Sequence, residues 1–180
     1  MSKIYWCWSN PVGSLRRLWQ NITRGWNDSD CWSLDHTIAE FVLPRLKVLQ
    51  KNKHGVPSSV QLSEETKNAL STLSEKEKEE REFEELQKVW DSILSKMVKS
   101  FEFIILDGDD LTIDHSGIEY KFIKSITHPD CSTMKVVGSE EAVKKYNDSV
   151  RLYCDIMRER EKQIKEGLLL FAEYFRGLWD

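Results

Sequence analysis

The apolar and polar positions of the first third of the chain follow the period of α-helices. Four apolar residues recur at spacings of three and four: Leu15, Leu18, Trp19 and Ile22. This spacing places them on one face of a short amphipathic helix. A second helix is expected from about Asp30 to Lys51, where the apolar arc is wide enough to predict neighbours on more than one side. Pro44 is expected to kink this helix, because proline lacks the backbone N–H.

The middle of the chain predicts one short helix and one long one. Ser63 is a candidate N-cap for the short helix, and Ser74 with Glu77 has the spacing of a capping box that opens the long one. The long helix begins in a run of charge, residues 75–85, which is typical of a solvated face. An apolar stripe then continues to Ile104. This stripe is narrower than that of the second helix, so one face of the long helix is expected to remain exposed to solvent.

The last third of the chain predicts a small β element followed by a further long helix. Residues 111–114 and 118–123 have the pattern of a β-hairpin, and 135–137 could form a third strand. The final helix is expected over 139–177. A break near Gly167 is predicted, because uninterrupted helices of that length are rare in small domains.

These elements predict a mainly α fold: a bundle of three long helices plus short N-terminal helices, with a small β-hairpin insert. The chain is expected to form a single helical domain over residues 1–180, with residues 107–137 as the inserted hairpin and loop. Its length is sufficient for a hydrophobic core.

Composition narrows the classes of partner. The net charge of −4 gives no global basic field, so nucleic acid is an unlikely ligand. No apolar run approaches the roughly 20 residues of a membrane span, so no membrane partner is expected. The four cysteines form no Cys-x-x-Cys pair and are expected to be free thiols in a reducing cytosol rather than zinc ligands. They are Cys7, Cys31, Cys131 and Cys154.

Tryptophan is unusually frequent and lies mostly at the start of the chain. Five of the seven tryptophans fall in the first 32 positions: Trp6, Trp8, Trp19, Trp26 and Trp32. Because aromatic side chains bury large areas, both this end and the aromatic C-terminal end, residues 171–179, are expected to be core. The two ends are predicted to pack against each other.

Trp26 and Trp32 flank the predicted start of the second helix and allow two interpretations. They could clamp the entry of the chain into the helix, in the manner of a hydrophobic staple. Alternatively, they could stack a planar ring of a nucleotide while Arg16, Arg17 or Arg24 pairs with its phosphates. The neighbouring aspartates would repel such a phosphate.

Asp35 is the most anomalous residue of the second helix. On a helical wheel it falls in the middle of the apolar arc, and Arg45 falls in the same arc. A buried carboxylate is costly unless it is paired. Asp35 is therefore expected either to join a buried polar network beneath the aromatic cluster or to act as a pocket carboxylate that binds a ligand or serves as a general base.

No constellation of catalytic residues is recognisable. The chain has no P-loop, no dinucleotide fingerprint and no Gly-x-Ser-x-Gly motif, and its histidines are isolated. Asp28, Asp30 and Asp35 could be interpreted as a carboxylate cluster for Mg²⁺, but helix capping explains two of them. The carboxylates of the Asp107–Asp110 turn could also be interpreted as a metal site. We expect no metal and no cofactor.

Several motifs carry a resemblance. They run Arg24-Gly25-Trp26, Asp28-x-Asp30-x-Trp32-Ser33-Leu34-Asp35-x-x-Ile38-Ala39, Pro44-Arg45-Leu46, His54-Gly55-x-Pro57, Trp90-x-x-Ile93-Leu94-x-x-Met97-x-x-x-Phe101-Glu102 and Glu166-Gly167-Leu168-x-x-Phe171-Ala172-x-Tyr174-Phe175-x-x-Leu178-Trp179-Asp180. This pattern resembles a family of small bacteriophage-encoded proteins of unknown function. It spans nearly the whole chain except the 107–137 insert.

The resemblance implies a bacteriophage accessory protein that acts in the host cytoplasm. We expect a non-enzymatic binder that sequesters a nucleotide-derived host immune signal, as a counter-defence. Its ligand-binding residues would be Arg16, Arg17, Arg24, Trp26, Trp32, Asp35 and Arg45. Two alternatives stay open. One is an interaction or structural module that engages a protein through the solvent-exposed face of the long helix after Ser74. The other is a metal-dependent nucleotide hydrolase. A homo-oligomer is also an expected partner state.

Overall fold

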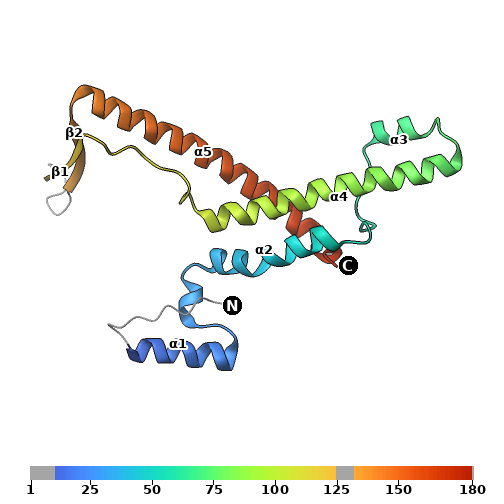
Figure 1. The fold of residues 1–180 in the computed structure, drawn as a ribbon, viewed down its shortest axis with the longest axis horizontal. Helices are drawn as coiled ribbons and strands as arrows, with labels where there is room; N and C mark the ends of the chain where they lie inside the picture. Colours follow the sequence, from blue (N-terminus) through green and yellow to red (C-terminus); the bar gives the residue numbers. More distant parts are fainter. Residues whose placement is uncertain (1–10, 125–131, 180) are drawn as a thin grey trace. The chain divides into compact units, whose positions relative to one another are not determined.

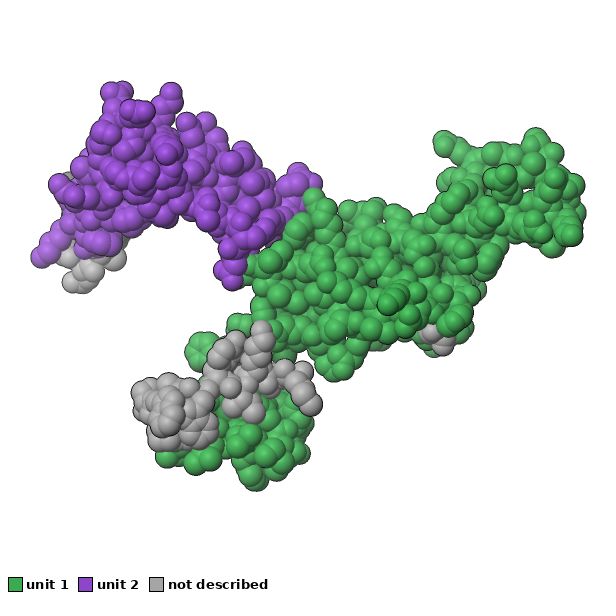
Figure 2. Space-filling view, in the orientation of Figure 1, with its two compact units in different colours: residues 1–107, 163–180 green, residues 108–162 purple. Residues whose placement is uncertain are grey.

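The fold is mainly α with one small β-hairpin, as the sequence predicts. The computed structural model describes residues 11–124 and 132–179. Trp6 and Trp8, which were expected in the core, lie outside the described residues, as do Cys7 and Cys131. The chain divides into two compact units, described separately below (Figure 2). Unit 1 comprises residues 1–107 and 163–180, and unit 2 comprises residues 108–162.

The described residues of unit 1 form helices joined by loops (Figure 1). Its helices are α1 (Pro11–Arg24), the 3₁₀ helix η1 (Asp28–Cys31), α2 (Leu34–Asn52), α3 (Glu64–Leu70), α4 (Glu75–Leu106), the C-terminal part of α5 (Glu140–Glu173) and η2 (Phe175–Gly177). Two predicted helix starts are confirmed. The hydroxyl of Ser63 caps α3 by accepting from the N–H of Thr66 at 3.3 Å, and α4 begins directly after Ser74.

The core of unit 1 lies along α4. Its buried apolar residues are Ala39, Leu46, Val60, Trp90, Ile93, Leu94, Met97, Val98 and Phe101. Polar contacts fix α2 antiparallel to α4: Lys47 pairs with Glu102 at 2.5 Å, and Gln50 donates to Ser95 at 2.8 Å. The apolar stripe predicted for α4 is therefore buried between Trp90 and Phe101.

The C-terminal end of the chain contributes to the core, as predicted, and it packs on α4. Tyr174 lies 5.6 Å from Trp90, and Phe171 meets Phe101 edge to face at 5.2 Å, both measured between ring centroids. Trp179, by contrast, is exposed. The described tryptophans of the N-terminal region do not join this cluster, so the predicted packing of the two aromatic ends is wrong for them.

The predicted break at Gly167 is wrong, because α5 continues through it. Gly167 instead lies at a close approach between α5 and α4. A Cβ at this position would meet the Cβ of Ser100 at 2.4 Å and the carbonyl oxygen of Lys96 at 2.6 Å. Lys96 Nζ also pairs with Glu166 at 2.7 Å beside the crossing. Glycine is therefore required here for helix packing and not for ending the helix.

Unit 2 holds the hairpin and the N-terminal part of α5. Strand β1 (Ile118–Lys124) pairs antiparallel with β2 (Ser132–Gly138), with Ile118 opposite Gly138. The hairpin predicted between residues 111–114 and 118–123 is therefore wrong. Residues 111–114 form no strand, and the segment named as a third strand is part of β2.

Side chains tie the residues before the hairpin to α5. The guanidinium of Arg160 forms two hydrogen bonds of 2.6 Å with the carboxylate of Asp110. Lys145 pairs with Asp114 at 2.8 Å. This second pair, together with the hydrogen bonds from Ser116, holds the pKa of Asp114 well below its usual range.

Candidate functional site

A set of polar contacts builds the turn between α1 and α2. Gly25, with φ +81°, ends α1 in a conformation that favours glycine. Asn27 then opens η1 with a complete capping box: its side chain accepts from the N–H of Ser29 at 3.0 Å, and Asp30 accepts from the N–H of Asn27 at 2.9 Å. Asp30 is thereby used for capping, as the sequence suggests.

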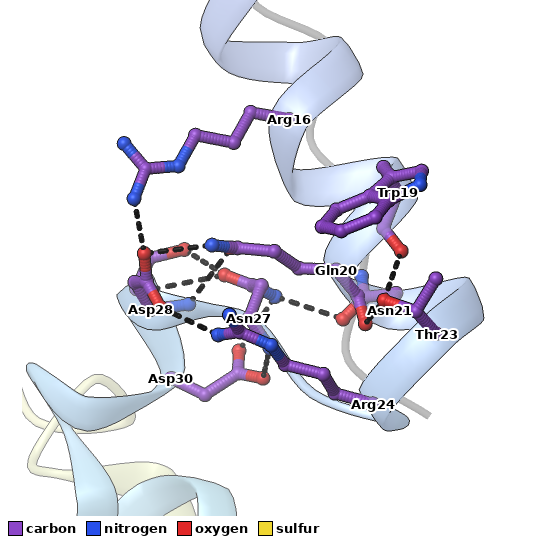
Figure 3. Close-up of polar contacts among 10 residues, drawn as sticks. Arg16, Trp19, Gln20, Asn21, Thr23, Arg24, Asn27, Asp28 and Asp30 are labelled. Carbon is purple, nitrogen blue, oxygen red and sulfur yellow. Dashed lines mark hydrogen bonds and ion pairs between the residues drawn. The ribbon is translucent and has the colours of Figure 1, made fainter.

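Three side chains of α1 converge on the carboxylate of Asp28 (Figure 3). Arg16 Nη2 donates to Oδ2 at 2.8 Å, Gln20 Nε2 donates to the same oxygen at 2.7 Å, and Arg24 Nη1 lies 3.5 Å from Oδ1. The N–H of Asp28 donates in return to Gln20 Oε1 at 3.2 Å. We call these four residues the Asp28 cluster. Its members on α1 are four residues apart and so lie on one face of the helix.

The Asp28 cluster is a local clamp, in which the carboxylate of Asp28 offsets one of the two positive charges of Arg16 and Arg24. The hydrogen bond from Gln20 lowers the pKa of Asp28, and the charges of Arg16 and Arg24 act in the same direction. Because Arg16 and Asp28 remain largely exposed, their ion pair contributes little to stability. Its main effect is to fix which side of α1 faces η1.

α1 buries two polar side chains and leaves its large apolar side chains exposed. Ser14 is 0% exposed and Gln20 3%. The large apolar side chains of the opposite face, in contrast, are between 56% and 75% exposed. They are Val12, Leu15, Trp19 and Ile22, which we call the α1 apolar face. Amphipathic helices normally bury this face against a core, so the arrangement is the reverse of the usual one.

The structure brings together three of the residues proposed from the sequence. Arg16 and Arg24 belong to the Asp28 cluster, and Trp26 lies beside them, with the Arg24 guanidinium 5.6 Å from its ring centroid. Arg17 is not part of the cluster, because it turns back to the carbonyl of Gly13 at 3.4 Å. Trp32 is 91% exposed, so the predicted clamp of Trp26 and Trp32 over the helix start is wrong.

The predicted burial of Asp35 is also wrong, because its side chain is exposed. Asp35 lies in the first turn of α2, next to the exposed Leu34, so its wheel position is apolar but uncovered.

Arg45 lies apart from the other proposed residues, on the exposed side of α2. Its guanidinium stacks on the ring of Phe41 at 3.6 Å from the centroid and donates to the Phe41 carbonyl at 2.5 Å. Sequence reasoning missed Gln20 and Phe41. Gln20 could have been predicted from the four-residue spacing of Arg16, Gln20 and Arg24 on the side of α1 opposite its apolar residues.

Unit 2 contains a second polar cluster beside a shallow pocket. His115 Nδ1 lies 2.7 Å from the hydroxyl of Tyr120, and the ring of Tyr146 packs against both. The pocket measures about 240 Å³, less than most small-molecule sites, and its lining includes Leu152 and Tyr153. The contacts within this cluster join β1 to α5 and are accounted for without a ligand.

Within residues 11–124 and 132–179, no group of three or more histidine, cysteine, aspartate or glutamate side chains could hold a metal ion. None of the helices in these ranges is long and apolar enough to cross a membrane. Comparison with protein-family models, curated proteins and solved structures finds no match to this chain.

Proposed function

We propose that this protein is a non-enzymatic interaction module that binds a partner protein through the α1 apolar face. The observation that supports this is the reversed packing of α1, with Gln20 buried and Ile22 exposed. Large exposed apolar surfaces on a folded protein usually mark interaction sites. In keeping with the resemblance to bacteriophage-encoded proteins, the partner would be a host or phage protein.

The anchor spacing suggests the chemistry of the partner. The α1 apolar face presents side chains at spacings of three, four and three, which suits an apolar groove that receives one face of a helix. Trp19 would be the largest anchor. An anionic lipid surface is less suited, because Asp28 already engages both Arg16 and Arg24.

The test is a partner capture with matched substitutions. Ile22→Asp places a charge on the α1 apolar face, and Ile123→Asp places the same charge on the exposed strand β1. A photo-crosslinking amino acid at Thr23, next to this face, should capture a defined partner with the wild-type chain and with Ile123→Asp, but not with Ile22→Asp. Equal capture by all three proteins, or none by the wild type, would overturn the proposal.

A second candidate is the sequestration of a nucleotide-derived immune signal at the same end of the molecule. The specific observation in its favour is that Arg16, Gln20 and Arg24 already hold one carboxylate, with Trp26 beside them. Guanidinium and amide donors arranged in this way also suit a phosphate. Asp28 would have to be displaced from them.

Calorimetry with cyclic dinucleotides and ADP-ribose derivatives tests this candidate. If it is right, Asp28→Asn should tighten binding by removing the competing carboxylate, and Arg16→Ala should weaken it. Failure of every ligand to bind more tightly than about 10 μM would exclude this candidate, because a protein that sequesters a signal must bind it at low concentrations.

A further inference from the structure

A second apolar face lies on α2, separate from the α1 apolar face. The side of α2 that carries Ala39 and Leu46 is buried against α4. Another side carries four apolar residues that are 46% to 59% exposed and that we call the α2 stripe: Leu34, Ile38, Phe41 and Val48. α2 is therefore apolar on two sides, but it has a described neighbour on only one of them.

The spacing of the α2 stripe is that of a seam between two helices. With Arg45 included, its positions alternate at four, three, four and three residues, which is the heptad pattern of paired helices. A flat ligand would not require a stripe that runs for four turns of helix. The fitting occupant is a second helix.

The charges of α2 indicate which helix fits. The acidic residues Asp35 and Glu40 lie in its first half, and the basic residues Arg45 and Lys51 lie in its second half. A second copy of α2 in parallel orientation would place like charges together. In antiparallel orientation the acidic half of each copy lies beside the basic half of the other, which is the self-complementarity that a two-fold symmetric interface needs.

Antiparallel pairing also explains the arginine within the stripe. If two copies of α2 overlap over their full length, residues equidistant from the helix ends face each other. Phe41 then faces Arg45 of the second copy, and Ile38 faces Val48 of the second copy. Arg45 already stacks on the Phe41 ring of its own helix at 3.6 Å. In the pair, each guanidinium would lie between two aromatic rings, a favourable environment for the cation.

We propose that the α2 stripe is a homodimer interface in which α2 pairs antiparallel with α2 of a second copy. This goes beyond the proposed function, because it involves a different face. A dimer would present two copies of the α1 apolar face and so bind a repeated or dimeric partner with increased avidity. The two proposals can fail independently, since Ile22 lies outside the α2 stripe and Phe41 lies outside the α1 apolar face.

Sedimentation equilibrium of the full chain tests the dimer with a matched pair of substitutions. Phe41 and Phe83 are both exposed phenylalanines, on α2 and α4 respectively. Phe41→Glu should weaken dimerisation at least about 100-fold, since each interface would receive two buried charges. Phe83→Glu should leave the dimer unchanged, and both variants should keep the wild-type helix content by circular dichroism.

The register is tested by disulfide formation between two variants made without the native cysteines. A mixture of Phe41→Cys and Arg45→Cys chains should form the mixed disulfide in preference to either self-pair. Three results would overturn the proposal. They are a monomeric wild type at about 100 μM, where a micromolar dimer is nearly complete; a Phe41→Glu variant that still dimerises; and a monomer whose Phe41→Cys thiol is protected, which would mean that another part of the chain or another protein covers the stripe.

Discussion

α4 and α1 are both amphipathic helices of unit 1, yet they bury opposite faces. α4 buries its apolar stripe, including Trp90, Leu94 and Phe101, against α2 and the last turns of α5. α1 buries Ser14 and Gln20 and leaves its large apolar side chains in solvent. The two helices therefore have similar sequence patterns with opposite environments.

The comparison shows that amphipathicity predicts a face but not what covers it. α4 is covered because α2 and α5 of the same chain supply the matching apolar surfaces. α1 is held by hydrogen bonds and ion pairs to Asp28 on its other side. Burial of apolar surface dominates folding free energy, so α4 carries the stability of unit 1, and α1 is left available for binding.

The largest difference in the free energy of unfolding is expected between two variants that each replace one leucine, one on α4 and one on α1. Leu94→Ala should lower the free energy of unfolding by about 3 kcal/mol, because a fully buried side chain leaves a cavity. Leu15→Ala should change it by less than about 0.5 kcal/mol, because Leu15 is exposed. Urea denaturation of both variants measures the difference. Equal losses would mean that the α1 apolar face is part of the core.

A smaller effect is expected at the crossing of α4 and α5. Gly167→Ala should destabilise the chain by about 2 kcal/mol, because the new methyl group meets Ser100 and the Lys96 backbone, which outweighs the better helix propensity of alanine. Gly55→Ala is the matched control, since no atom lies within 4 Å of its added Cβ. If both variants are as stable as the wild type, the close approach of these helices is wrong.

The smallest effect is a pH dependence of the Asp28 cluster. The pKa of Asp28 is lower in the folded chain than its usual value of 3.8, so the cluster stabilises the folded chain above that value. The contribution is lost as the pH falls through the lower, folded pKa. The side-chain amide signals of Gln20, followed by NMR in acid, should shift in this window. In the Asp28→Asn variant they should not, and a shift there would remove Asp28 as the cause.

The sequence predicts the elements of this fold well where caps and apolar periods act locally. The short helix after Ser63 and the long helix after Ser74 begin where their capping residues predict. The hairpin is different, because strand pairing depends on distant residues. The segment before Gly117 had the composition of a strand, but β1 pairs with β2, which follows it.

The candidate site was predicted less well, because its residues depend on tertiary contacts. Asp35 sits at an apolar wheel position, yet it lies in the first turn of α2 and its side chain is exposed. Trp32 was expected to clamp the helix start, but it is almost fully exposed. Arg16 and Arg24 were expected to meet an anion, and they do, although the anion is Asp28 of the same chain.

In unit 1 the polar side of α1 faces inward and its apolar side faces solvent. Cysteine accessibility tests it directly in the full chain, with the four native cysteines replaced by serine. Trp19→Cys and Ile22→Cys should react with a maleimide at least about tenfold faster than Ser14→Cys and Gln20→Cys, because exposure governs the reaction of thiols of similar pKa. The reverse order, with Ser14→Cys and Gln20→Cys reacting faster, would contradict the account.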